Sequence, residues 1–107
     1  PPSVIQCKVE PRYTPEALRA GVRGTAVIRL AIDESGAVTQ ATLTRWHSPD
    51  NHPPLGLDNA ALDAVRQWKF VPLTRNGRPS ATNANVEIHL TPELEKSRRA
   101  DSRSCKE

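Results

Sequence analysis

Alternating apolar and polar positions mark three segments of this chain as β-strands. Residues 25–32 place Ala26, Ile28, Leu30 and Ile32 at even positions, which is typical of a strand with one buried face. The turn residues Asp33-Glu34-Ser35-Gly36 follow, and residues 37–46 return as a second strand. A third alternating run covers residues 85–90.

The second strand breaks its own alternation. Val38 is even-numbered, whereas the next apolar residues, Ala41 and Leu43, are odd-numbered, so strict alternation would send them to opposite faces of the sheet. One extra residue in the strand restores the phase. We therefore expect a β-bulge near Thr39 and Gln40.

Two helices are expected between and before these strands. The first is short, with Thr14 as its N-cap, Pro15 at its first position and Gly21 as its end. The second is predicted to begin with Asp58 as its N-cap and to run to Trp68 before Pro72 ends it. Its apolar stripe makes Trp68 a core residue, and we interpret Tyr13 and Phe70 in the same way.

The order strand, strand, helix, strand predicts an α+β fold with a short N-terminal helix ahead of a β-β-α-β core. A helix of roughly eleven residues is about 16 Å long, enough to carry the chain back along the sheet. The third strand then lies beside the first and antiparallel to it. We expect a three-stranded antiparallel sheet of order 2-1-3 with both helices packed on one face.

In that topology the third strand is an edge. Its outward N–H and C=O groups have no partner in the domain, and residues 85–90 contain no lysine, proline or glycine to protect them. A regular edge of this kind can accept an extended peptide as an additional strand. The sequence thus predicts a peptide-binding edge.

Composition narrows the function without assigning one. The chain has 107 residues, of which 36% are hydrophobic and 25% charged, which fits one compact domain. It lacks an apolar run of 18 residues, so the domain is not expected to enter a membrane, and its first residue, proline, suggests a segment of a longer protein. The net charge of +3 is not clustered, and only four residues are aromatic, which argues against nucleic-acid binding.

Candidate chemical sites are few. Cys7 and Cys105 are the only cysteines; they either form a bridge that closes nearly the whole chain or are two unrelated thiols. His47 and His52 have no acidic or thiol ligand at a suitable spacing, so no metal site is expected. No nucleophile motif such as G-x-S-x-G is present. We expect neither an enzyme nor a cofactor.

Several motifs, taken in order, resemble the TonB C-terminal domain family from about Val9 to Leu90. These motifs are Pro-Arg-Tyr-Thr-Pro-Glu-Ala at 11–17, Arg-Gly-Thr at 23–25, Ile-Asp at 32–33 with Gly-Ala-Val at 36–38, Gly-Leu-Asp at 56–58, Ala-Leu at 61–62, Ala-Val-Arg at 64–66, Trp-Lys-Phe at 68–70 with Pro72, and Asn-Gly-Arg-Pro at 76–79. The chain departs from the family pattern at residues 45–49, in the longer loop that follows them, and in its long tail.

The resemblance implies a periplasmic domain, tethered to the inner membrane through an upstream region. Its implied partners are an inner-membrane motor, reached through that region, and TonB-dependent outer-membrane transporters. A short transporter peptide, the TonB box, pairs with the last strand of such domains. We expect residues 1–10 to end a proline-rich linker, residues 11–90 to form the domain and residues 91–107 to form a polar tail. The peptide-binding residues carried over are Ala84, Asn85, Val86, Glu87, Ile88, His89 and Leu90.

Two other functions stay open from the sequence. The first is a passive envelope adaptor or sensor of the same fold, whose edge strand is covered by the tail through a Cys7–Cys105 bridge. The second is a binder of polyanions or of the cell wall, driven by the basic charge balance.

Overall fold

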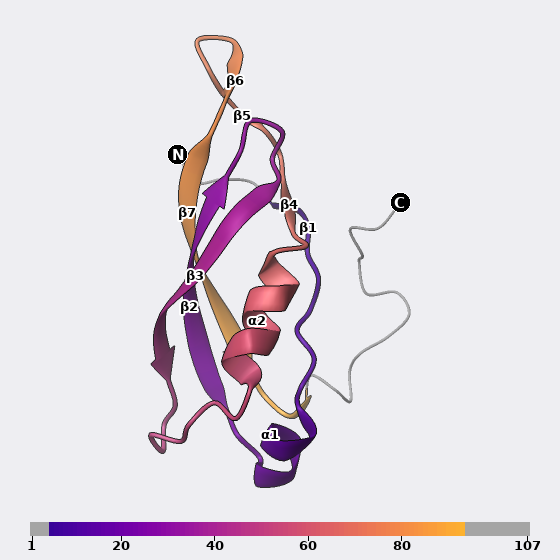
Figure 1. Ribbon diagram of the computed structural model, residues 1–107, viewed down its shortest axis with the longest axis vertical. Coiled ribbons are helices and arrows are strands. Elements are labelled where there is room, and N and C mark those ends of the chain that lie inside the picture. Colours follow the sequence, from indigo (N-terminus) through magenta and orange to yellow (C-terminus); the bar gives the residue numbers. More distant parts are fainter. Residues whose placement is uncertain (1–4, 94–107) are drawn as a thin grey trace.

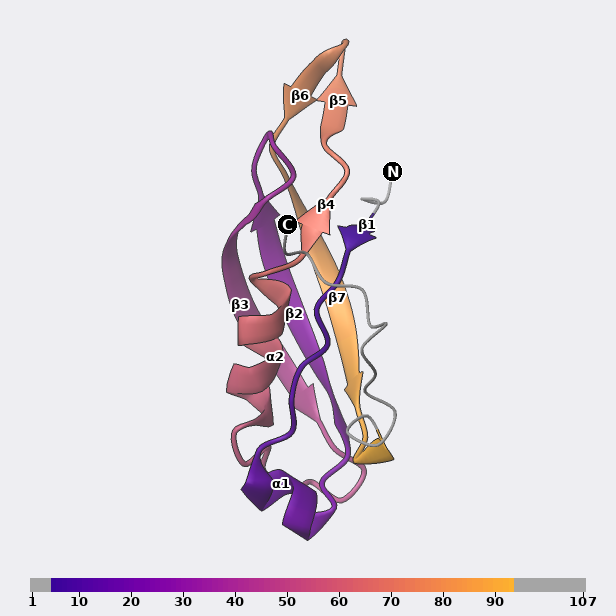
Figure 2. The ribbon, with the colours of Figure 1, turned by 90° about the vertical axis from the view of Figure 1, so that its right-hand side faces the viewer.

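The computed structural model describes residues 5–93, which form a sheet covered on one face by two helices (Figures 1 and 2). Its elements, in chain order, are β1 (Ile5–Cys7), α1 (Pro15–Ala20), β2 (Gly24–Ile32), β3 (Val38–His47), α2 (Leu57–Val65), β4 (Lys69–Phe70), β5 (Leu73–Arg75), β6 (Arg78–Ser80) and β7 (Thr82–Leu90).

The central sheet has the predicted topology. Its strands lie in the order β3-β2-β7, and β2 is antiparallel to both neighbours. β2, β3 and β7 correspond to the first, second and third predicted strands, so the order 2-1-3 is confirmed. Both helices lie on the same side of the sheet in Figure 2. The predicted α+β fold class is therefore confirmed.

The bulge predicted in the second strand is present, and a second one accompanies it. Ala31 faces Gln40 whereas Ile32 faces Val38, which leaves Thr39 as the extra residue. Further along, Val27 faces Arg45 and Ile28 faces Leu43, which leaves out Thr44. Each extra residue shifts the phase by one. All four apolar residues of β3 consequently pack against the core: Val38, Ala41, Leu43 and Trp46.

One hydrophobic core lies between the sheet and the helices. The even-numbered residues of β2 from Ala26 to Ile32 are buried, as predicted, together with Tyr13, Trp68 and Phe70. The Trp68 indole Nε1 donates a hydrogen bond to the Val9 carbonyl at 2.9 Å, and its ring lies 6.4 Å from that of Phe70. The aromatic pair thus packs the N-terminal segment onto the core.

The start and end of the second helix were predicted wrongly. α2 begins at Leu57 after Gly56, which has a φ of 93° and provides no side-chain cap. The Asp58 carboxylate accepts a hydrogen bond only from the next amide, that of Asn59, at 2.9 Å. The helix begins early because Gly56 adopts the left-handed conformation that most residues avoid, and this places Leu57 in the core. α2 ends at Val65, so Trp68 reaches the core from the turn after it.

The first helix agrees with its prediction in full. Thr14 is the N-cap, and its Oγ1 accepts a hydrogen bond from the Ala17 amide at 3.1 Å. The same hydroxyl donates to the Leu55 carbonyl at 2.7 Å. Thr14 therefore caps α1 and also attaches it to the loop that leads into α2.

Four short strands were not predicted. β1 pairs with β4, with Ile5 opposite Phe70, and β5 pairs with β6 as a separate hairpin. Each strand has two or three residues, too few to show an alternating pattern. β1 falls within residues 1–10, the segment predicted to be the end of a linker.

Candidate functional site

The edge strand β7 is the most regular element of the sheet. It pairs with β2 without a shift in register, from Gly24 opposite Leu90 to Ile32 opposite Thr82. β7 begins at Thr82, two residues before the predicted binding segment and three before the alternating run. The polar residues there, Thr82 and Asn83, give no apolar alternation, so the sequence pattern alone could not locate this end.

The outer side of β7 is open in the part of the chain that the structure describes. No described strand pairs with β7 other than β2, and no backbone hydrogen bond from another described segment reaches it. Alternate N–H and C=O groups of an edge strand point away from the sheet. Within residues 5–93, β7 thus offers a continuous row of unpaired backbone groups.

The side chains of β7 alternate between core and surface as the sequence predicted. Ile88 and Leu90 are buried and Ala84 and Val86 are half-buried on the helix side. The exposed residues of the predicted site are Asn85, Glu87 and His89. His89 Nδ1 lies 3.1 Å from the Thr25 hydroxyl across the β2–β7 pair. The opposite face of the strand is therefore polar and accessible.

The other edge of the sheet, β3, is much less suited to a guest strand. Its two bulges interrupt the backbone pattern at Thr39 and Thr44. The hydroxyls of both bulged residues bond to the backbone of β2: Thr39 donates to the Ala31 carbonyl at 3.2 Å and Thr44 to the Val27 carbonyl at 3.1 Å. Bulges are a common means of blocking edge-to-edge pairing. Of the two edges, β7 is the one that stays regular.

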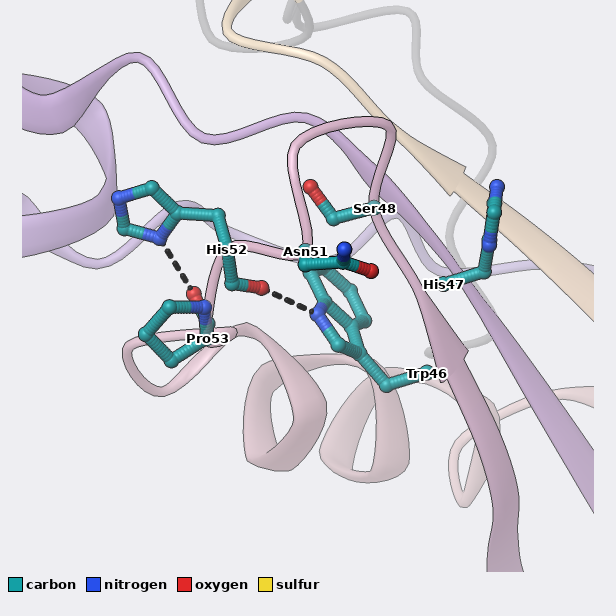
Figure 3. A pocket seen from close by; sticks show the side chains of 6 residues that line it. All are labelled: Trp46, His47, Ser48, Asn51, His52 and Pro53. Atoms are coloured by element: carbon teal, nitrogen blue, oxygen red, sulfur yellow. Dashed lines mark hydrogen bonds between the residues drawn. The ribbon is translucent and has the colours of Figure 1, made fainter.

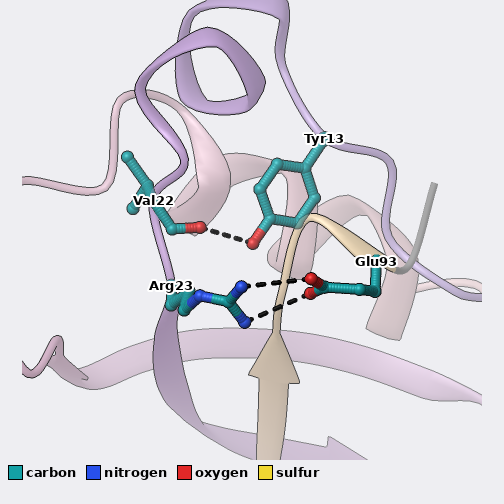
Figure 4. Close-up of polar contacts among 4 residues, drawn as sticks. All are labelled: Tyr13, Val22, Arg23 and Glu93. Carbon is teal, nitrogen blue, oxygen red and sulfur yellow. Dashed lines mark hydrogen bonds and ion pairs between the residues drawn. The ribbon is translucent and has the colours of Figure 1, made fainter. Parts of the chain in front are cut away.

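An ion pair fixes the C-terminal end of β7 to the start of β2. The two guanidinium nitrogens of Arg23 each donate to a different Glu93 carboxylate oxygen, both at 3.1 Å (Figure 4). The hydrogen bonds from Arg23 lower the pKa of Glu93. Both side chains are more than half exposed, so the pair orients the chain end more than it stabilises the fold. The sequence pattern gives no sign of this contact, because Glu93 lies in the segment predicted to be the tail.

Tyr13 lies beside this ion pair and is itself buried. Its hydroxyl donates a hydrogen bond to the Val22 carbonyl at 2.6 Å (Figure 4). Burial raises the pKa of Tyr13 to about 12, although the positive charge of Arg23 opposes that shift. The neutral phenol thus joins the segment before α1 to the residue two positions before β2.

We expect this tyrosine to make the protein less stable at high pH. The unfolded chain releases the Tyr13 proton near pH 10, whereas the folded protein holds it to about pH 12. The free energy of unfolding should therefore be at its full value below pH 10 and fall by up to about 2 to 3 kcal/mol between pH 10 and 12. Urea unfolding across this range measures it. Tyr13→Phe should flatten the dependence, and an unchanged slope in that variant would contradict the assignment.

A shallow pocket of about 270 Å³ lies in the loop after β3, in the region that the sequence led us to expect would depart from the family pattern. The Trp46 indole Nε1 donates to the His52 carbonyl at 2.8 Å, so Trp46 fixes the loop (Figure 3). The rings of His47 and His52 point to opposite sides in Figure 3. Among the described residues, no group of three potential metal ligands is brought together.

The remaining candidate residues are only partly covered by the structure. Cys7 ends β1 and is half-buried, whereas Cys105 lies outside the described residues, as does most of the tail. The bridge between the two cysteines therefore stays a prediction. Neither described helix has the length and apolar character needed to span a bilayer.

The sequence has clear relatives. The family described as Gram-negative bacterial TonB protein C-terminal matches residues 9–91. The chain is 38% identical over 80 residues to "Protein TonB" of Xanthomonas campestris pv. campestris, and the match covers 75% of this chain and 34% of that protein. It is 29% identical over 89 residues to "Protein TonB" of Vibrio cholerae serotype O1. That match covers 83% of this chain and 34% of the Vibrio cholerae protein.

The fold also has a known counterpart. A solved structure of the TonB2 protein from Vibrio anguillarum superimposes with a TM-score of 0.52 at 22% identity, covering 84% of this chain and 83% of that one. This similarity supports the fold. The chain spans about a third of the length of the curated relatives named above.

Proposed function

This chain belongs to the family of Gram-negative bacterial TonB protein C-terminal domains, and on that premise we propose that it captures the TonB box of outer-membrane transporters as a guest strand on β7. Members of this family are energy transducers and not enzymes. In the proposed role, the domain couples energy from an inner-membrane motor to uptake across the outer membrane.

The observation that supports this proposal best is the regular edge of β7, which no other strand of residues 5–93 covers. Nine consecutive residues keep a regular register with β2, while bulges interrupt the competing edge. Strand addition needs a regular row of free backbone groups more than it needs particular side chains. The binding residues in the proposal are those predicted from the sequence, Ala84 to Leu90, extended to Thr82.

The wider arrangement is part of the same proposal. The domain acts in the periplasm and is tethered to the inner membrane by an upstream region that also contacts the motor. The proposed limits are a linker that ends within residues 1–10, a domain at residues 11–90 and a tail at residues 91–107; β1 lies within the first range and packs with the domain through its pairing with β4. The family match at residues 9–91 is consistent with these limits.

A peptide titration followed by NMR tests the capture step. We expect a TonB-box peptide to shift the backbone amide signals of β7 first and most, because the new hydrogen bonds form there. Signals of β3 serve as the internal control, since its bulged edge should not respond. Saturating peptide that leaves β7 unchanged would rule out capture at this edge.

Amide exchange distinguishes capture from the passive adaptor. Unpaired edge amides exchange rapidly, whereas amides covered by another segment are protected. In the free protein we expect fast exchange at every second residue of β7. Uniform protection along β7 would mean that the edge is already occupied, as the adaptor hypothesis requires.

A further inference from the structure

The hairpin formed by β5 and β6 extends past the end of the central sheet (Figures 1 and 2). Its turn residues, Asn76 and Gly77, both have positive φ, at 55° and 78°, as a tight two-residue turn requires. Arg75 and Arg78 flank the turn and face each other in the register. Both are exposed. The hairpin therefore carries two guanidinium groups at its tip.

This pair of arginines is electrostatically unfavourable by itself. Residues directly opposed in a hairpin have Cβ atoms roughly 5 Å apart, and side chains of like charge at such a pair of positions repel each other. The stretch from residue 69 to 82 contains no aspartate or glutamate, and no ion pair found within residues 5–93 includes Arg75 or Arg78. Asp33, in the β2–β3 turn, already accepts hydrogen bonds from Ser35 and Ala37. Among residues 5–93, therefore, no acidic side chain forms an ion pair with either arginine.

The hairpin continues the edge strand. Only Ala81 separates β6 from β7; β6 leads directly into β7 in Figure 1, and the chain bends between them in Figure 2. At about 3.3 Å per residue, the four residues from Thr82 to Arg78 span at most roughly 13 Å. A guest strand that pairs with β7 and continues past Thr82 for about four residues would reach both arginines.

We infer that Arg75 and Arg78 bind acidic residues of the guest peptide, located about four residues beyond the position that pairs with Thr82. The inference rests on the proposed capture at β7. Guanidinium groups match carboxylates in geometry as well as in charge. An acidic peptide is favoured over nucleic acid because the arginines lie next to the start of β7. A peptide can form backbone hydrogen bonds with this edge strand, whereas a nucleic acid cannot.

Three peptides test this inference on the whole 107-residue chain. All share a nine-residue centre of alternating threonine and valine, and each carries a four-residue extension at both ends. The first has two aspartates in its N-terminal extension, the second has them in its C-terminal extension, and the third has asparagines instead. Affinity is measured at low ionic strength, because exposed ion pairs are screened by salt. The β7 amide signals are recorded in the same titrations.

We expect one of the two acidic peptides to bind about three- to tenfold more tightly than the neutral one, as two exposed ion pairs allow. Which one binds more tightly reports the direction of the guest strand. The double variant Arg75→Gln, Arg78→Gln should remove that advantage without changing the affinity for the neutral peptide. Arg19→Gln, in α1 at the opposite end of the molecule, is the matched charge control and should retain it.

The outcomes separate the inference from the function on which it rests. Equal affinity of all three peptides, with β7 signals shifted, overturns the inference and leaves capture intact. The inference also fails if both acidic peptides gain affinity equally over the neutral one, or if this gain in affinity survives in the double variant. It fails as well if an oligonucleotide or an anionic lipid vesicle shifts the amide signals of the hairpin while the acidic peptides do not. A titration in which no peptide shifts β7 overturns the capture proposal itself, and the inference with it.

Discussion

Replacing Gly36 with alanine is expected to lower the free energy of unfolding by about 3 kcal/mol. Gly36 has a φ of 90°, and a Cβ atom there would overlap the Phe70 carbonyl oxygen. The left-handed conformation costs an alanine about 1 to 2 kcal/mol. Moving Phe70 away would also weaken its amide hydrogen bond to the Gly36 carbonyl, now 2.9 Å long, at a cost of about 1 kcal/mol. Urea unfolding followed by tryptophan fluorescence measures the loss.

Gly77→Ala is the matched control for that experiment. Gly77 also has a positive φ, 78°, but no atom lies within 4 Å of the place where its Cβ would be. Alanine there should cost only the conformational part, about 1 to 2 kcal/mol, and less than the loss at Gly36. Equal losses in the two variants would mean that the close approach of Gly36 to Phe70 is not what fixes the β2–β3 turn onto β4.

Methylating the backbone of the guest peptide is expected to weaken its binding about 100-fold. In strand addition, every second amide of the guest faces β7 and donates a hydrogen bond to it. N-methylation at two such positions removes two hydrogen bonds, each worth about 1 to 1.5 kcal/mol, which corresponds to roughly 100-fold in affinity. Calorimetric titration of the chain with the plain and methylated TonB-box peptides measures the change.

A peptide methylated on the intervening amides is the control for the peptide methylated on the amides that face β7. Methyl groups on the intervening residues point away from β7, because the guest strand becomes the new edge of the sheet. They should leave the affinity nearly unchanged. Similar losses in both registers would show that the peptide is held by its side chains, which contradicts capture through the backbone of Thr82–Leu90.

The sheet could be predicted from the sequence because its pattern is long and periodic. Residues 25–32 alternate over eight positions, and even the loss of phase after Val38 was informative, since it located the bulge at Thr39. The second bulge, at Thr44, went unnoticed because only Trp46 follows it in the strand. One apolar residue cannot establish a new phase.

Helix boundaries and small strands depended on contacts that a local pattern does not encode. Asp58 has the side chain of a good N-cap, yet α2 begins one residue earlier because Gly56 accepts a left-handed backbone. The pairing of β1 with β4 joins residues more than sixty positions apart. No sequence window of ordinary length contains both partners.

The position of β7 at the edge of the sheet was predicted, whereas the contacts around this strand were not. The edge position of β7 followed from element order, which is a topological argument and needs no side-chain detail. The contact between Arg23 and Glu93 required knowing where the chain goes after Leu90. The relation of the Arg75–Arg78 tip to β7 likewise depends on how the hairpin is oriented in space.

The uninterrupted register between β2 and β7 has a mechanical consequence. Ladder hydrogen bonds in an antiparallel pair are perpendicular to the strands, so tension applied along the strand axis loads them in shear and together. Peeling a strand from one end would instead break them singly, at a lower load. A guest strand pulled lengthwise along β7 would therefore transmit tension to β2 through the whole nine-residue seam.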